Sequence, residues 1–153
     1  MSKKLKMSKS RIRVTVYESI YTDLSRENGE SDSCIDQSSH VYASVTDVAK
    51  ELANLIANGF SAEDSGDITS MRTEMETDHY SGNDTELGCY VQFGNSFDRD
   101  AAENELRGLI ILELSSCHGW QNEREIRRAV GLTSVSNVLP WLLSIPQRPR
   151  RWS

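Results

Sequence analysis

Long apolar runs are missing from this sequence. No stretch of about 18 consecutive apolar residues occurs, so no membrane-spanning helix is expected. Residues 1–10 are basic, but no apolar segment follows them, and they therefore lack the pattern of a secretory signal. Internal repeats are also absent. We expect a cytoplasmic protein whose length fits one domain with a small appended module.

Motifs of catalysis are missing as well. There is no glycine-rich phosphate loop, no H-E-x-x-H and no nucleophile elbow. Asp78 and His79 are neighbours on an expected strand and point to opposite faces, so they do not converge on a metal ion by themselves. The histidines at positions 40, 79 and 118 could meet only through the fold. We predict no enzymatic activity, no cofactor and no bound metal.

Cysteine is scarce. Cys34, Cys89 and Cys117 are odd in number and widely spaced, which excludes a C-x-x-C pair and argues against a disulfide framework. We expect reduced, partly buried thiols. Cys117 precedes His118, but adjacent residues do not face one way on a helix, and no zinc-like spacing is present. The sequence leaves the role of this pair open.

Charge is distributed unevenly behind a net charge of −6. Residues 1–13 carry basic side chains and no acids, and residues 122–153 carry six arginines against two glutamates. The middle of the chain is strongly acidic. Basic ends attract phosphate and an acidic body repels it, so either the ends bind nucleic acid or the body imitates it. In a third interpretation, the acidic side chains only keep a small domain soluble.

The apolar pattern predicts an α+β protein. Alternation from Arg11 to Tyr17 predicts a strand, residues 22–39 a long polar loop, and residues 40–43 a short strand. Ser44 is expected to cap a helix that ends at Asn58 and Gly59.

A hairpin and a long helix are predicted next. Residues 71–78 and 87–93 alternate on either side of the turn 81–84, with one apolar face and one acidic face. Asp98 or Asp100 caps a helix that reaches about Cys117. We expect a small antiparallel sheet packed on two helices, followed by a C-terminal unit like a helix-turn-helix.

Composition suggests four segments. Residues 1–10 form a disordered basic arm, and residues 11–97 form the acidic α+β body. Residues 98–145 form the helical unit, and residues 146–153 form a basic tail rich in proline and arginine.

The segment from Asn122 to Leu142 carries the most specific pattern. Apolar residues at helical spacing stop at Gly131, and a second apolar stripe begins at Val135. The stretch R-E-I-R-R-A-V-G-L-T-S resembles the helix-turn-helix of LexA-type repressors, and the resemblance covers about residues 100–143. It implies packing positions at Ile126, Ala129, Val130 and Leu132, and a turn at Gly131. The residues expected to contact DNA are Arg124, Arg127, Arg128, Ser134, Ser136, Asn137, Arg148, Arg150 and Arg151.

The same segment departs from that family. Pro140 would kink the second helix, and no sequence remains for a wing. Two other interpretations remain. The segment is a helical hairpin that closes the core, or it is a helix-turn-helix used for protein contact or for homo-oligomers through Trp141 and Leu143.

The acidic body offers a competing site. Alternate residues of a strand recur at about 6.6–6.8 Å, close to the phosphate repeat of a nucleic-acid strand. Small acidic inhibitors from phages and mobile elements are similar in size and acidity. The residues expected to bind a partner in this way are Glu63, Asp64, Asp67, Glu74, Glu76, Asp78 and Trp141.

We predict a non-enzymatic nucleic-acid-binding or regulatory accessory protein, of the kind carried by phages or mobile elements, that contacts DNA through its C-terminal unit. The alternative is an acidic inhibitor that imitates nucleic acid and binds a host nucleic-acid-handling protein. The sequence specifies neither the DNA site nor the partner.

Overall fold

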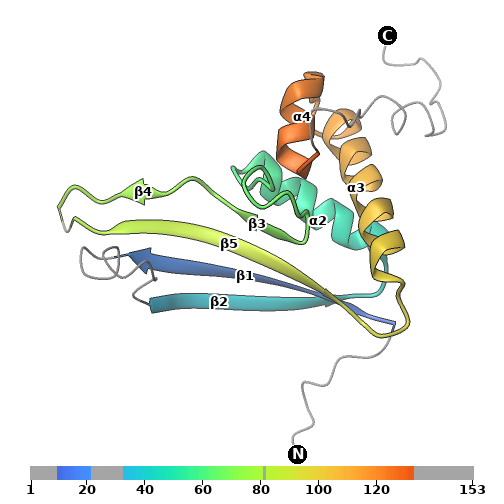
Figure 1. Ribbon diagram of the computed structural model, residues 1–153, viewed down its shortest axis with the longest axis horizontal. Helices are drawn as coiled ribbons and strands as arrows, with labels where there is room; N and C mark the ends of the chain where they lie inside the picture. Colours follow the sequence, from blue (N-terminus) through green and yellow to red (C-terminus); the bar gives the residue numbers. More distant parts are fainter. Residues whose placement is uncertain (1–9, 22–32, 81, 133–153) are drawn as a thin grey trace, which may run out of the picture.

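The chain folds as an α+β protein with an antiparallel sheet and helices on one side of it (Figure 1). The computed structural model describes residues 10–21, 33–80 and 82–132. The predicted fold class is confirmed for this part of the chain. The basic arm, the expected second helix after Gly131 and the C-terminal tail lie outside the described residues.

The sheet is built around β1 (Ile12–Tyr21) and β5 (Asp84–Phe93), which pair along their whole length. β2 (Ser33–Tyr42) pairs with the other edge of β1, and β3 (Ser70–Arg72) with the other edge of β5, giving the order β2-β1-β5-β3. β4 (Glu76–Thr77) also pairs with β5. The strand predicted near the N-terminus is confirmed and continues to Tyr21.

The predicted polar loop over residues 22–39 is wrong for its second half. Residues 33–39 belong to β2, whose pairing with β1 runs from Ile12↔Tyr42 to Ile20↔Ser33 with a bulge after Glu18. The exposed side chains of Gln37, Ser38 and Ser39 give no apolar alternation, because they lie on an edge strand. Backbone pairing with β1 therefore defines a strand that the polar composition of these residues did not indicate.

The predicted hairpin is confirmed, but its first strand is interrupted. Residues 73–75 separate β3 from β4, and the register changes by one residue between Arg72↔Gly88 and Glu76↔Thr85. The prediction of one continuous strand over 71–78 is therefore wrong. Met71 pairs with Cys89 in the core, whereas Met75, within the interruption, is exposed.

The helices follow the predicted caps closely. α2 (Val45–Ala57) begins at Ser44, whose side chain accepts a hydrogen bond from Asp47 N, and ends at Asn58. α3 (Arg99–Ser116) begins at Asp98 and is followed by the break at residues 118–120. α4 (Glu123–Val130) begins at Asn122 and ends at Gly131.

One hydrophobic core joins these elements. It contains residues of the sheet, of the three helices and of the loop after α2, among them Ile12, Val91, Leu52, Ile110 and Ile126. α3 packs chiefly on α2 and also contacts α4. The described part of the expected unit 98–145 thus shares its core with the segment 11–97. Among the described residues, no helix has the length and apolar character needed to cross a membrane.

Candidate functional site

The helix predicted before Gly131 and the turn predicted at Gly131 are both present. The Asn122 side chain accepts a hydrogen bond from Glu125 N at 3.1 Å, which caps α4. Gly131 has the left-handed conformation, with φ 76°, and Leu132 N donates to Arg127 O at 2.9 Å. The second helix, with Ser134, Ser136, Asn137 and Trp141, lies outside the described residues, and so do the three arginines of the tail.

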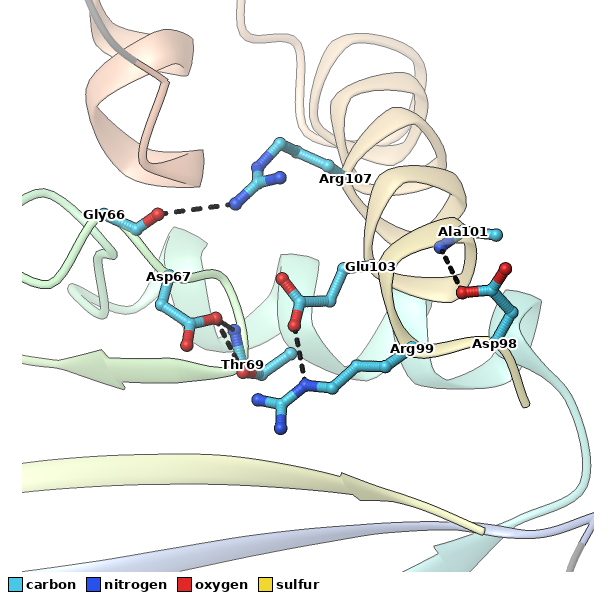
Figure 2. Close-up of polar contacts among 8 residues, drawn as sticks. All are labelled: Gly66, Asp67, Thr69, Asp98, Arg99, Ala101, Glu103 and Arg107. Atoms are coloured by element: carbon cyan, nitrogen blue, oxygen red, sulfur yellow. Dashed lines mark hydrogen bonds and ion pairs between the residues drawn. The ribbon is translucent and has the colours of Figure 1, made fainter. Parts of the chain in front are cut away.

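This turn is docked on the acidic loop that follows α2, residues 61–69. Ala62 N donates to Ala129 O at 2.9 Å, and the guanidinium of Arg107 on α3 donates to Val130 O at 2.9 Å and to Gly66 O at 3.5 Å (Figure 2). Gly131 lies so close that an added Cβ would be 2.9 Å from the carbonyl carbon of Gly66. The last carbonyl groups of α4 are thus bound within the protein.

The arginines of α4 differ in their surroundings. Arg128 forms an ion pair with Glu63, with 3.2 Å between Nε and Oε2 and 3.3 Å between Nη2 and Oε1. Arg124 is exposed, and Arg127 is half-buried. A phosphate would have to compete with Glu63 for Arg128, which weakens the predicted role of this residue in DNA contact.

The first predicted acidic group, Glu63, Asp64 and Asp67, is divided among different roles. Glu63 is paired with Arg128. Asp67 is half-buried, and its Oδ1 accepts hydrogen bonds from Thr69 N at 2.9 Å and from Thr69 Oγ1 at 2.6 Å (Figure 2). Asp64 is exposed. The carboxylate of Asp67 therefore fixes a turn, and the group does not present one row of charge.

The second predicted acidic group is not one strand row either. Glu74 lies between β3 and β4, Glu76 lies on β4, and Asp78 lies in the turn after β4. The Asp78 side chain accepts a hydrogen bond from Tyr80 N at 2.9 Å. Glu74 and Glu76 remain exposed, so two of the three predicted residues face solvent at this edge while Asp78 stabilises the turn.

A hollow of about 340 Å³ lies between the end of α2, the strands β1 and β5, and the segment that joins β3 to β4. We call it the acidic hollow; it is lined by Glu18, Asn58, Gly59, Thr73, Glu74, Glu76, Thr85, Glu86 and Leu87. Pairing brings Glu18 beside Leu87 and Glu76 beside Thr85. Leu87, on the central strand β5, is 40% exposed. The hollow thus combines carboxylates from separate strands with an apolar contact.

Glu18 was missed in the sequence analysis. It continues the alternation of Ile12, Val14 and Val16, so it lies on the same face of β1 as those core residues. Extending the predicted strand by one more step of two residues would have placed its carboxylate there. Glu18 interrupts the apolar alternation, so the sequence pattern alone predicts a strand that ends at Tyr17.

The acidic hollow offers hydrogen-bond acceptors and negative charge. Ionised carboxylates accept hydrogen bonds from lysine and arginine, while Leu87 can contact the apolar stem of such a side chain. Within residues 10–21, 33–80 and 82–132, no group of histidine, cysteine and acidic side chains has a metal-binding arrangement.

The two cysteines whose side chains are described differ. Cys89 is buried in the core, and burial raises the pKa of its thiol to about 12, which makes it a poor nucleophile. Cys117 is exposed, so the prediction of partial burial is wrong for it. Its neighbour His118 is half-buried, and His40 and His79 lie on β2 and after β4.

The described part of the chain is acidic as a whole. It contains nine lysine and arginine residues against nineteen aspartate and glutamate residues. The net charge of this part therefore favours a basic partner over long distances, and nucleic acid could bind to it only through local contacts.

Comparisons with known proteins do not assign this surface. No family model, no curated protein and no solved structure matches the chain. Its function must therefore be inferred from charge, shape and chemistry.

Proposed function

We propose that this protein is a non-enzymatic regulatory accessory protein whose acidic hollow binds a basic surface of a nucleic-acid-handling protein. The observation that carries the proposal is the convergence of Glu18, Glu74 and Glu76 around a hollow that also exposes Leu87. The partner supplies lysine or arginine side chains, and the acidic body accelerates their approach.

Several contacts must act together in this complex. A single exposed ion pair contributes only about 0–1 kcal/mol, because both charges are well hydrated. Three carboxylates from β1, the β3–β4 segment and β4 can engage two or more cations at once, and Leu87 adds apolar area. The combination favours an extended basic surface over a single free cation.

The distribution of the carboxylates over separate strands supports a partner with a broad basic surface, such as one that normally binds nucleic acid. Glu18 and Glu76 lie on strands that flank β5, so their charges are distributed across the sheet. A groove that binds phosphates can accept such an array.

The test is a fluorescence-anisotropy titration of a labelled peptide of alternating arginine and leucine. The variant Glu18→Gln/Glu74→Gln/Glu76→Gln removes three charges from the hollow. Asp100→Asn/Glu105→Gln/Glu123→Gln removes three exposed charges from α3 and α4 and is the matched control. We expect at least a tenfold loss of affinity for the first variant and less than a twofold change for the second. Equal losses would overturn the proposal, because net charge alone would then explain binding.

DNA contact through the C-terminal unit is the second candidate function. It is favoured by the capped α4 and the left-handed Gly131, which are the first helix and turn that the motif requires. A labelled random duplex is titrated at about 50 and 200 mM salt. Affinity that falls steeply with salt, and a smaller salt slope in Arg124→Ala/Arg127→Ala, would support this candidate. Absence of binding at the lower salt would exclude it.

A further inference from the structure

The face of the sheet opposite the helices carries a group of tyrosines. α2, α3 and α4 all lie on the other side (Figure 1). The alternation of β1 and β5 places Tyr17, Tyr21 and Tyr90 on this open face, together with Gly88 and Arg72. None of these residues lines the acidic hollow.

Tyr17 and Tyr90 form the centre of this group. Their ring centroids are 6.1 Å apart, with 47° between the ring planes. Tyr17 is paired with Gly88, and a Cβ added to Gly88 would lie 2.4 Å from both Cζ and Oη of Tyr17. The Tyr17 ring therefore lies across the backbone of β5 in space that only glycine leaves open. The absence of a side chain at position 88 leaves room for this ring against the sheet.

Small polar residues beneath the rings are almost fully buried. Thr15 is 1% exposed and Ser19 is 7% exposed, although both are on the open face. The hydroxyls of Thr15 and Ser39 are hydrogen bonded at 2.8 Å, so this layer has its polar groups paired. Neighbouring side chains must therefore cover these residues. Tyr90, which is 36% exposed, lies at the surface of this covered layer. We call Tyr17, Tyr90 and Arg72 the tyrosine platform.

Arg72 gives the tyrosine platform a positive charge. It pairs with Gly88 and lies in the same row across the sheet as Tyr17. Burial raises the pKa of Tyr17 and of Tyr21, and the positive charge of Arg72 opposes both increases. Glu86 accepts a hydrogen bond from the Tyr21 hydroxyl at 3.4 Å and marks the acidic end of the face.

We propose that the tyrosine platform binds single-stranded nucleic acid, with bases stacked on Tyr90 and Tyr17 and a phosphate bound by Arg72. Aromatic rings on an open antiparallel sheet, beside an arginine, provide the two interactions that unpaired bases and their backbone need. Duplex DNA keeps its bases stacked inside and cannot use the rings. The site lies on the face opposite the acidic hollow and does not depend on the proposed function.

A second copy of the chain is a weaker occupant for this face. Stable self-association needs a large and more apolar patch. Among the described residues of this face, the exposed large hydrophobics are Val41 and Tyr90, and their neighbours are serine, threonine, glutamine and arginine. The charge of Arg72 is complementary to a phosphate backbone, whereas two copies of Arg72 facing each other would repel.

The test is a fluorescence-anisotropy titration of labelled oligothymidylate, dT12, with the full chain. We expect salt-dependent binding at micromolar protein. Tyr90→Ala should weaken it about tenfold, because one stacking surface is lost. Gly88→Ala should also weaken it, because the new methyl displaces the Tyr17 ring without removing it. Arg72→Ala should reduce the salt slope, and Arg72→Lys should restore most of it.

Tyr80→Ala is the matched control, because Tyr80 is fully exposed in the turn after β4 and outside the platform. Circular dichroism and urea unfolding establish that each variant is folded. No binding of dT12, or an equal loss in Tyr80→Ala, would overturn the proposal. So would a change from dimer to monomer in Tyr90→Ala without dT12 binding, which would make this face a self-interface. Failure of the proposed function is separate, since Tyr90→Ala should still bind the basic peptide.

Discussion

The Arg128 guanidinium donates two hydrogen bonds to the Glu63 carboxylate, at 3.2 and 3.3 Å. This pair connects α4 to the acidic loop after α2. Both side chains are at least half-exposed, so the pair is well hydrated and adds little to stability. The pair also occupies an arginine that the helix-turn-helix pattern would assign to phosphate contact.

Replacing Glu63 by glutamine should therefore release Arg128. We expect the free energy of unfolding in urea to change by less than about 1 kcal/mol. If the C-terminal unit contacts DNA, affinity for a random duplex at low salt should rise. Asp64→Asn removes one charge from the exposed neighbouring residue and is the control. An equal rise in both variants would show that only net charge matters.

The docking of Gly131 on Gly66 can be tested with a pair of glycines. Gly131 and Gly119 have nearly the same positive φ, 76° and 74°, but only Gly131 has atoms within 4 Å of an added Cβ. Gly119→Ala should cost about 1 kcal/mol of unfolding free energy from backbone strain. Gly131→Ala should cost at least about 1 kcal/mol more, because its methyl meets backbone. Equal costs, measured by urea unfolding, would contradict the close packing of this turn.

Local chemistry explains which parts of the fold the sequence could predict. Ser44, Asp98 and Asn122 are residue types that strongly favour the N-cap position of a helix. Gly131 ends α4 with a positive φ, which glycine adopts easily. These signals depend on a few adjacent residues. The helix bounds were therefore predictable to within a residue or two.

Long-range pairing explains what the sequence could not predict. β2 has polar, exposed side chains and is a strand because β1 supplies its hydrogen bonds. The interruption between β3 and β4 depends on their register with β5. Asp78, which was expected in a row of acidic strand residues, therefore lies in a turn. Likewise, nothing near Arg128 in the sequence indicates Glu63, which is 65 residues away.

Arg107 should stabilise the end of α4 more than the exposed ion pair does. Its guanidinium donates to Val130 O at 2.9 Å and to Gly66 O at 3.5 Å, and the side chain is half-buried. Arg107→Met keeps the apolar stem and removes both donors. We expect a loss of about 1–3 kcal/mol in unfolding free energy, because carbonyl groups lose a charged partner. Hydrogen exchange of Gly131 and Leu132 amides should become faster, while amides of α2 should be unchanged at low denaturant.

Arg99→Met is the matched control for that change. Arg99 is also on α3, but its partner is Glu103 on the same helix, at 3.0 Å, and its side chain is mostly exposed (Figure 2). We expect a loss below about 0.5 kcal/mol. Similar losses for both arginines would indicate that Arg107 does not bind α4 to the loop.

Stability should fall at alkaline pH partly because of Cys89. Burial raises the pKa of this thiol from 9.0 to about 12, so the unfolded chain loses the proton first. The contribution is complete below pH 9 and is lost as pH rises from about 9 to about 12, at up to about 1.4 kcal/mol per pH unit. Tyr17, Tyr21 and Tyr42, whose pKa values burial also raises, act in the same direction.

Urea unfolding of the wild type and Cys89→Ala at pH 8, 9.5 and 10.5 measures this contribution. The variant should be less stable at pH 8, because a buried side chain is shortened, and should lose less stability between pH 9.5 and 10.5. Cys117→Ala removes an exposed thiol and is the matched control. Parallel slopes for wild type and Cys89→Ala would mean that the thiol ionises as easily in the folded protein as in the unfolded chain, and that water reaches it.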